Sequence, residues 1–87
     1  MLRIKEQQRR PDTVLTLEGD LIGAWVDELA RTCAQAHVAA GTLTIDLAAV
    51  GFVDQRGLDL LRSLQRRGAS LLNVSSFVGE QLKAAAR

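Results

Sequence analysis

The stretch Leu43-Thr-Ile-Asp-Leu-Ala-Ala-Val-Gly-Phe-Val-Asp54-Gln-Arg-Gly57-Leu-Asp-Leu-Leu61 changes its periodicity midway and decides the fold. Residues 42–47 alternate apolar and polar side chains and are rich in β-branched types, which predicts a strand. After Asp54 the leucines recur every three residues, which predicts an amphipathic helix. A short loop over residues 48–53 is expected to connect the two. A strand followed by a helix is the repeating unit of an α/β fold.

Downstream of this stretch, one more strand and one more helix are expected. Gly68 is the predicted stop of the helix that begins after Asp54, because glycine commonly follows a helix C-terminus. Residues 69–74 form a short apolar run typical of a buried strand. A last helix is predicted to follow, with Ser75 or Ser76 as its cap.

Upstream, two extended segments are expected to form an antiparallel hairpin. Residues 2–8 open with alternating apolar and basic side chains, and residues 13–18 alternate as well, which is the period of a half-buried strand. Between them, Arg9-Arg10-Pro11-Asp12 supplies a turn, because proline fixes φ and aspartate tolerates turn geometry.

A helix is predicted between the hairpin and the quoted stretch. After Gly19-Asp20 the period changes, and apolar residues recur every three or four positions over residues 22–40, which predicts about four helical turns ending at Gly41. Trp25 lies on the apolar stripe and is expected in the core; the alternative is an exposed contact for a partner. Cys33 is expected to be a small buried residue.

The predicted order of elements is ββαβαβα. Strand-helix-strand units of this length imply parallel neighbours, and with the hairpin they give a small mixed four-stranded sheet with helices packed on it. The 87 residues suffice for one modest core and are too few for two. Residues 1–87 are therefore expected to form a single α/β domain.

The composition points away from nucleic acids and membranes. The formal net charge is +1, and the aromatic residues, Trp25, Phe52 and Phe77, are too few for base stacking, so no nucleic-acid partner is expected. No apolar run approaches the roughly 20 residues that cross a bilayer, and the first residues lack the apolar core of a signal peptide. The chain is expected to be cytoplasmic, without membrane insertion.

Residues that carry chemistry are sparse. Cys33 is the only cysteine and His37 the only histidine, which excludes an internal disulfide and a thiolate zinc cluster. Neither forms a recognisable nucleophile and base arrangement with Asp54, and a glycine-rich phosphate loop is absent. We therefore expect no catalytic residue, no metal site, no cofactor and no enzymatic activity.

The quoted stretch resembles the central signature of STAS domains. That family has an apolar strand ending in Asp-Leu, an apolar pair before an aspartate, and a Ser-Ser-Gly or similar tripeptide that opens a leucine-rich helix. The matching segments in this chain are, in the same order, Asp46-Leu47, Phe52-Val53 and Asp54-Gln-Arg-Gly57. Residues 17–21 and 68–74 are similar to the family's turn after its second strand and to its last strand. The resemblance covers nearly the whole chain and implies the STAS fold.

The resemblance also implies a function. STAS domains include bacterial anti-sigma factor antagonists, which bind a serine kinase that doubles as an anti-sigma factor. A protein-binding module in signal transduction and transcription regulation is therefore expected. The family also includes small subunits of lipid-transport ATPase systems, and nucleotide binding has been proposed for some members. A transport ATPase subunit and a weak nucleotide- or anion-binding module remain the alternatives, and the oligomeric state is left open.

The chain departs from the family at its regulatory position. In antagonists, the residue after the motif aspartate is a serine or threonine that the partner kinase phosphorylates, and the added charge breaks the complex. Here that residue is Gln55, followed by Arg56, and neither has a hydroxyl. No phosphorylation is expected at Gln55, and Gln55 is neutral, so it does not imitate a phosphoserine. Ser75 and Ser76 are the minor alternative for a displaced site.

The partner is expected to dock on the motif and on the helix that follows it. The predicted binding residues are Asp54, Gln55, Arg56, Gly57, Leu58, Arg62 and Arg66.

Three of these residues have a second interpretation. Asp54 can instead cap the helix, and Gly57 can be required sterically by the fold. Arg56 opposes the helix dipole, so it is expected to meet an acidic partner or a bound anion, or else to extend into water. The later arginines of the helix form either a solvated face or a strip suited to an acidic protein surface.

Overall fold

The computed structural model describes residues 1–9, 12–36 and 42–85. Its elements follow the predicted order ββαβαβα. They are β1 (Leu2–Arg9), β2 (Asp12–Leu21), α1 (Ala24–Ala36), β3 (Leu43–Val53), α2 (Gln55–Arg66), β4 (Ser70–Leu72) and α3 (Ser76–Ala85).

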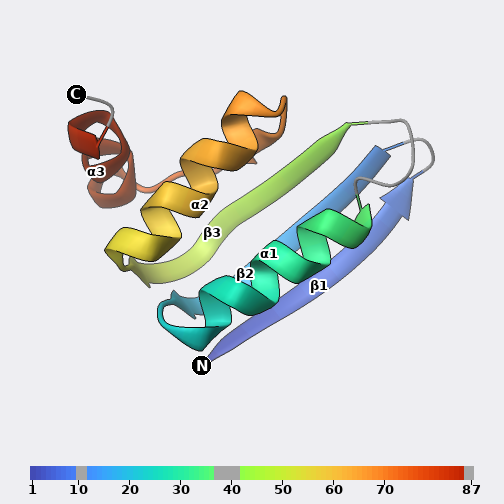
Figure 1. The fold of residues 1–87 in the computed structure, drawn as a ribbon, viewed down its shortest axis with the longest axis horizontal. Coiled ribbons are helices and arrows are strands. Elements are labelled where there is room, and N and C mark those ends of the chain that lie inside the picture. Colours follow the sequence, from blue (N-terminus) through green and yellow to red (C-terminus); the bar gives the residue numbers. More distant parts are fainter. Residues whose placement is uncertain (10–11, 37–41, 86–87) are drawn as a thin grey trace.

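The strands form one mixed sheet in the order β1-β2-β3-β4 (Figure 1). β1 runs antiparallel to β2, as the hairpin prediction required, and Leu2 lies opposite Gly19. β2 and β3 are parallel, and so are β3 and β4. The predicted α/β class with a small four-stranded mixed sheet is confirmed.

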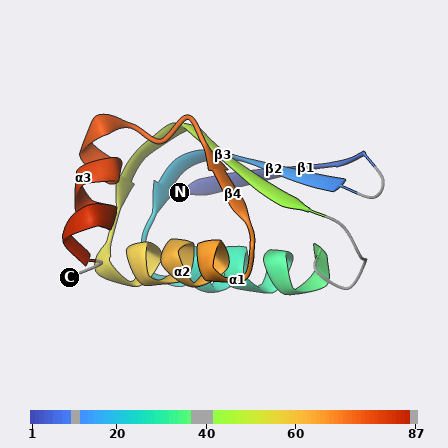
Figure 2. The same ribbon diagram turned by 90° about the horizontal axis from the view of Figure 1, so that it is seen from above.

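The sheet carries its core on one face. Helices α1 and α2 lie side by side across that face, and α3 stands at one end of the molecule, next to α2 (Figure 2). The leucines of the sheet and of α2 fill the space between the two layers, which is the arrangement expected for elements with one apolar face. The most deeply buried side chains are Leu15, Leu17, Leu21, Leu29, Ile45, Leu47, Leu61, Leu64, Val53, Val78 and Cys33.

The loop predicted over residues 48–53 is wrong, because β3 continues to Val53. The pairing with β2 shifts register twice, between Thr16 and Glu18 and between Gly19 and Asp20, and each shift inserts one extra residue into β3. These β-bulges break the alternation of buried and exposed side chains, so the strand period disappears from the sequence.

Other boundaries also move. The second strand, predicted over residues 13–18, runs on to Leu21, because Gly19 and Asp20 also pair with β3. The predicted last strand shortens to Ser70–Leu72. The predicted helix end at Gly41 lies outside the described residues, as do His37 and the Arg10-Pro11 part of the first turn.

Gly68 ends α2 as predicted, through two backbone hydrogen bonds. The Gly68 amide donates to the carbonyl of Gln65 at 3.0 Å, and the Ala69 amide donates to the carbonyl of Leu64 at 2.9 Å. This is the Schellman pattern, which needs a residue with positive φ after the cap. The φ of Gly68 is 96°, which a glycine adopts without strain.

The buried stripe of α1 is centred on Val26, Leu29 and Cys33 rather than on Trp25. Trp25 is 36% exposed, so the prediction that it lies in the core is wrong. It precedes Val26 by one position, about 100° around the helix, which places it at the margin of the stripe. Cys33 is buried as predicted, and burial raises the pKa of its thiol to about 11, so it stays protonated.

Candidate functional site

Asp54 fixes the start of α2 and ties it to the turn before α1. Its Oδ1 accepts a hydrogen bond from the Gly57 amide at 2.8 Å, which confirms the predicted cap. Its Oδ2 accepts a second bond from the amide of Gly23 at 2.9 Å. The Asp54 amide in turn donates to the carbonyl of Leu21 at 3.1 Å. Through its side chain and its backbone amide, this one residue therefore connects the ends of β2 and β3 with the beginnings of α1 and α2.

These bonds favour the ionised carboxylate. The amide of Gly23 and then that of Gly57 lower the pKa of Asp54, and the nearby charge of Arg56 adds to the effect. Asp54 is therefore an anchored carboxylate that remains charged at neutral pH. It is poorly suited to general acid or base catalysis near neutral pH.

Two members of the predicted binding segment face the interior. Gly57 is buried, and a Cβ placed on it would lie 2.7 Å from Cγ1 of Val53 and 2.8 Å from the carbonyl oxygen of Leu21. The fold itself therefore requires a glycine here. Leu58 is also buried, at 4% exposure, and belongs to the core cluster. Surface contacts of this segment must come from its other residues.

Gln55, which the resemblance places at the family's phosphorylation position, is exposed at the first turn of α2. Its Nε2 donates to Oδ1 of Asp59 at 3.0 Å, one turn further along the helix. The amide is thus oriented along the surface of α2 and presents no ionisable group. A side chain without a hydroxyl cannot accept a phosphoryl group from a serine or threonine kinase.

Arg56 forms an ion pair within the chain that the sequence did not indicate. Its Nη2 lies 2.6 Å from Oδ1 of Asp27, a residue in the first turn of α1. The two side chains are 60% and 59% exposed, so the pair lies at the surface. Asp27 supplies the charge that offsets an arginine at a helix N-terminus.

Replacing Arg56 by serine is expected to change the free energy of unfolding by less than about 1 kcal/mol. Removing the cation relieves its conflict with the helix dipole but also breaks the pair with Asp27. A double-mutant cycle with Asp27→Asn, measured by urea unfolding, should give a coupling of about 0.2–1 kcal/mol. The coupling should shrink in 1 M salt, since exposed pairs are screened. A coupling of zero at low salt would show that the pair does not form in solution.

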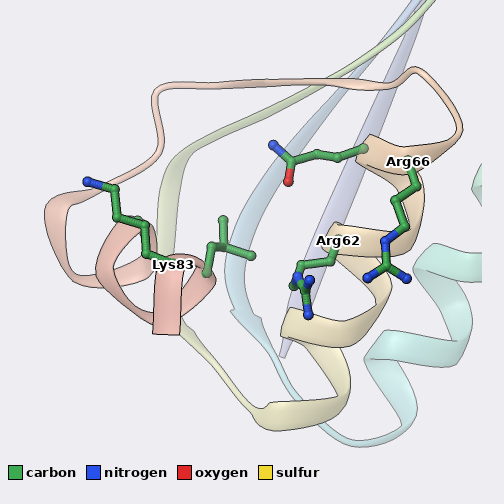
Figure 3. A pocket seen from close by; sticks show the side chains of 6 residues that line it. Arg62, Arg66 and Lys83 are labelled. Atoms are coloured by element: carbon green, nitrogen blue, oxygen red, sulfur yellow. The ribbon is translucent and has the colours of Figure 1, made fainter. Parts of the chain in front are cut away.

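A basic groove of about 520 Å³ runs between α2 and α3. Arg62 and Arg66 lie next to one another on α2, whereas the ammonium end of Lys83 on α3 points away from them (Figure 3). Arg62 is half-buried, and Arg66 is exposed. The groove joins the two predicted arginines to a third cation, on an element that the sequence did not connect with them.

Ser75 serves as the cap of α3. Its Oγ accepts a hydrogen bond from the amide of Val78 at 3.1 Å, and its carbonyl accepts one from the amide of Gly79 at 2.8 Å. Ser76 is the first residue of the helix. Both serines are exposed, and the predicted cap is confirmed for Ser75.

One surface residue beside the motif was missed by sequence reasoning. Phe52 is 47% exposed and stands two residues before Asp54. The second bulge of β3 lies just before Phe52, at residue 51, and of the apolar pair Phe52-Val53 only Val53 lies in the core. An exposed aromatic next to exposed polar groups is a composition typical of protein interfaces.

Within residues 1–9, 12–36 and 42–85, no group of three or more His, Cys, Asp or Glu side chains is arranged to hold a metal ion. Over the same residues, no helix is long and apolar enough to cross a membrane.

No protein-family model matches the sequence, and no curated protein does. Solved structures do. The anti-sigma factor antagonist SpoIIAA in its unphosphorylated form matches with a TM-score of 0.72 and 21% identity, over 93% of this chain and 82% of that one. An antisigma-factor antagonist STAS domain from Rhodobacter sphaeroides matches with a TM-score of 0.64 and 15% identity, over 83% and 86% of the two chains.

A third structure, of Mglu, has a TM-score of 0.63 and 19% identity. The match covers 78% of this chain but only 18% of that one, so the similarity is to one part of a larger protein. The two antagonist structures establish the fold: the chain folds like SpoIIAA and the Rhodobacter sphaeroides STAS domain, as its sequence predicted.

Proposed function

We propose that this chain is a STAS-type regulatory module that binds a protein partner and catalyses no reaction. The fold it shares with SpoIIAA supports this role at the level of architecture. Its partner would be an anti-sigma factor of the serine kinase type, in the cytoplasm of a bacterium. Residues 1–87 would act as one domain in signal transduction and transcription regulation.

The observation that carries the proposal is the surface at the start of α2. Gln55 and Arg56 are exposed there, and each is held by a carboxylate, Asp59 in one case and Asp27 in the other. Asp54 anchors the backbone beneath them through bonds to two amides. Phe52 adds an exposed aromatic group. A firmly positioned patch of this kind suits recognition, because little side-chain order has to be created on binding.

The module would lack a phosphorylation switch at the position where antagonists of this family carry one. Gln55 is neutral and donates a hydrogen bond to Asp59, so this position keeps one charge state. A phosphoserine would bring a charge of about −1.5 to −2 to the same surface. Binding would therefore respond to the amount of the module, or to a modification elsewhere, for which Ser75 and Ser76 are the exposed hydroxyls singled out by the sequence.

A second candidate function draws on the basic groove between α2 and α3. Arg62 and Arg66 lie next to one another along it, and adjacent cations favour an acidic ligand, whether a nucleotide, another anion or an acidic protein segment. Titration with ATP and GTP tests the nucleotide directly. A transport ATPase as partner would be identified by the mass of the captured protein.

We expect Gln55→Glu to weaken partner binding by about tenfold or more. The substitution keeps the size of the side chain but places a carboxylate beside Asp59, and so imitates in part the charge of the phosphorylated family members. The partner would first be captured from a lysate of the native host on the immobilised protein. The purified partner would then be titrated calorimetrically with wild type and variant, and thermal melts would confirm that the variant is folded.

Gln65→Glu is the matched control for this test. It makes the same change on the same helix, ten residues and about 15 Å away, beside the basic groove. Its effect on affinity should be less than about threefold. If Gln65→Glu weakens binding while Gln55→Glu does not, the partner binds at the groove between α2 and α3. If neither changes affinity, the α2 surface is not the binding site.

A further inference from the structure

β1 is an edge strand whose outer backbone groups can be assigned from its register. Among the described residues it pairs only with β2. The Asp20 amide donates to the carbonyl of Met1 at 3.1 Å, so Met1 and the odd-numbered residues of β1 direct their backbone bonds toward β2. The N–H and C=O groups of Leu2, Ile4, Glu6 and Gln8 therefore point to the free edge.

The same residues border a groove between β1 and α1. It has a volume of about 300 Å³ and is lined by Leu2, Ile4 and Glu6 from the strand and by Trp25, Glu28 and Thr32 from the helix. Trp25 is 36% exposed, so the groove offers part of an indole ring beside free hydrogen-bonding groups. An extended peptide alongside β1 would hydrogen-bond to its free backbone groups and place side chains in the groove. In strand addition, the backbone bonds give affinity and the side-chain contacts give specificity.

The charges around the edge differ on the two faces of the sheet. On the α1 side, the groove carries the carboxylates of Glu6 and Glu28. Among the described residues, Glu6 accepts a hydrogen bond from Gln8 and Glu28 pairs with Arg31, and both contacts are exposed. On the opposite side β1 presents Arg3 and Lys5, both exposed. An added strand must therefore place apolar and basic side chains toward α1 and acidic or neutral ones on the other face.

A second copy of this chain does not meet these conditions. If β1 paired antiparallel with β1 of a second copy, three central registers would keep the groove-facing side chains of both strands on the same face of the sheet. They place Arg3 opposite Lys5, Lys5 opposite Lys5, or Glu6 opposite Glu6. Like charges directly opposite one another disfavour pairing, and charged side chains are a common protection of edge strands against self-association. The occupant is thus a segment of another protein.

We propose that the β1 edge and the groove beneath Trp25 form a second docking surface, which takes an extended partner segment alternating apolar or basic residues with acidic ones. The segment adds to the sheet as a fifth strand. This surface is separate from the start of α2, so a partner held there could be joined by a second, strand-like contact at β1.

A synthetic peptide tests the proposal directly. Acetyl-Thr-Lys-Glu-Val-Glu-Val-Thr-amide, antiparallel to β1, puts its lysine opposite Glu6, its valines opposite Ile4 and Leu2, and its glutamates opposite Lys5 and Arg3. Trp25 is the only tryptophan and the chain has no tyrosine, so intrinsic fluorescence reports on this groove alone. Saturable binding with a blue shift of the emission is the expected result.

Backbone methylation distinguishes strand addition from simple charge attraction. N-methylation of the two valines removes hydrogen bonds to Ile4 and Leu2 and should weaken binding by about tenfold or more. N-methylation of the two glutamates, whose N–H groups point away from β1, should leave the affinity within about twofold. Equal effects of the two modifications would overturn the proposal.

A charge exchange tests the recognition of the side chains. Glu6→Lys should weaken binding of the parent peptide by about tenfold, and a peptide with glutamate in place of its lysine should restore it. Asp59→Lys, at the start of α2, should leave the titration unchanged, so failure here is separable from failure of the α2 surface. Failure of the exchanged peptide to bind Glu6→Lys, or sedimentation showing dimers joined through β1, would contradict the proposed occupant.

Discussion

Replacing Gly57 with alanine is expected to lower the free energy of unfolding by about 2–4 kcal/mol. The new Cβ would lie 2.8 Å from the carbonyl oxygen of Leu21 and 2.7 Å from Cγ1 of Val53. Both atoms belong to the packed junction of β2 and β3, so α2 must shift away from the sheet to accommodate the methyl group. Thermal unfolding should show a Tm lower by about 10–25 °C.

Gly79→Ala is the matched control, because it makes the same change inside a helix that has room for it. Its Cβ would meet no atom closer than Cγ1 of Val74 at 3.8 Å, which is an ordinary contact. Alanine is the better helix former by about 1 kcal/mol, so this variant should be as stable as the wild type or slightly more stable. If the two substitutions shift Tm in the same direction and by similar amounts, the close approach at Gly57 does not exist in solution.

Gly57 also shows how one residue of the motif serves the fold rather than the partner. Its place after Asp-Gln-Arg allows two interpretations from the sequence: a contact for a partner, or a position where the fold has no room for a side chain. The structure favours steric need, because helix α2 crosses the end of the sheet at a distance that only a glycine allows. Leu58 is buried beside it, so the surface that a partner meets is smaller than the motif.

Periodicity predicted most elements because it reflects burial directly. The alternation in β1 and β2 and the leucine spacing in α2 follow from one buried face each, and these elements lie close to where they were expected. The end of β3 was missed because its two bulges remove the alternation. Trp25 was misplaced because an apolar residue at the margin of a helical stripe has the same spacing whether it faces the core or a groove.

The sequence singled out the residues at the start of α2, but it did not indicate their partners within the chain. Arg56 and Asp27 are separated by 29 positions, and Asp54 and Gly23 by 31. Such contacts arise where the beginnings of two helices meet at one end of the sheet, and local patterns do not report that distance. The unfavourable charge of Arg56 at a helix start did indicate that a compensating anion was needed. In the structure, the carboxylate of Asp27 supplies such an anion.

Asp54→Asn is expected to lower the Tm by about 5–10 °C at pH 7. The carboxylate accepts bonds from the amides of both Gly23 and Gly57, whereas asparagine offers one oxygen, so one amide loses its acceptor. Because these bonds hold the pKa of Asp54 below its ordinary value, the folded protein binds a proton there less readily than the unfolded chain. The stabilisation is therefore complete at neutral pH and is lost as the pH falls below about 4 toward the folded-state pKa.

The difference in Tm between wild type and Asp54→Asn should consequently shrink as the pH falls from 7 to 2.5, since a protonated Asp54 also retains only one accepting oxygen. Hydrogen bonds also lower the pKa of Asp12, from Thr42, and the pKa of Asp46, from Ala48 and Asn73. These two groups titrate in both proteins, so their effects on Tm cancel in the comparison. Asp59→Asn is the control, because Asp59 accepts a single exposed side-chain bond. It should shift Tm by no more than about 2 °C. A difference for Asp54→Asn that stays constant with pH would mean that the anchor at the start of α2 does not depend on the charge of Asp54.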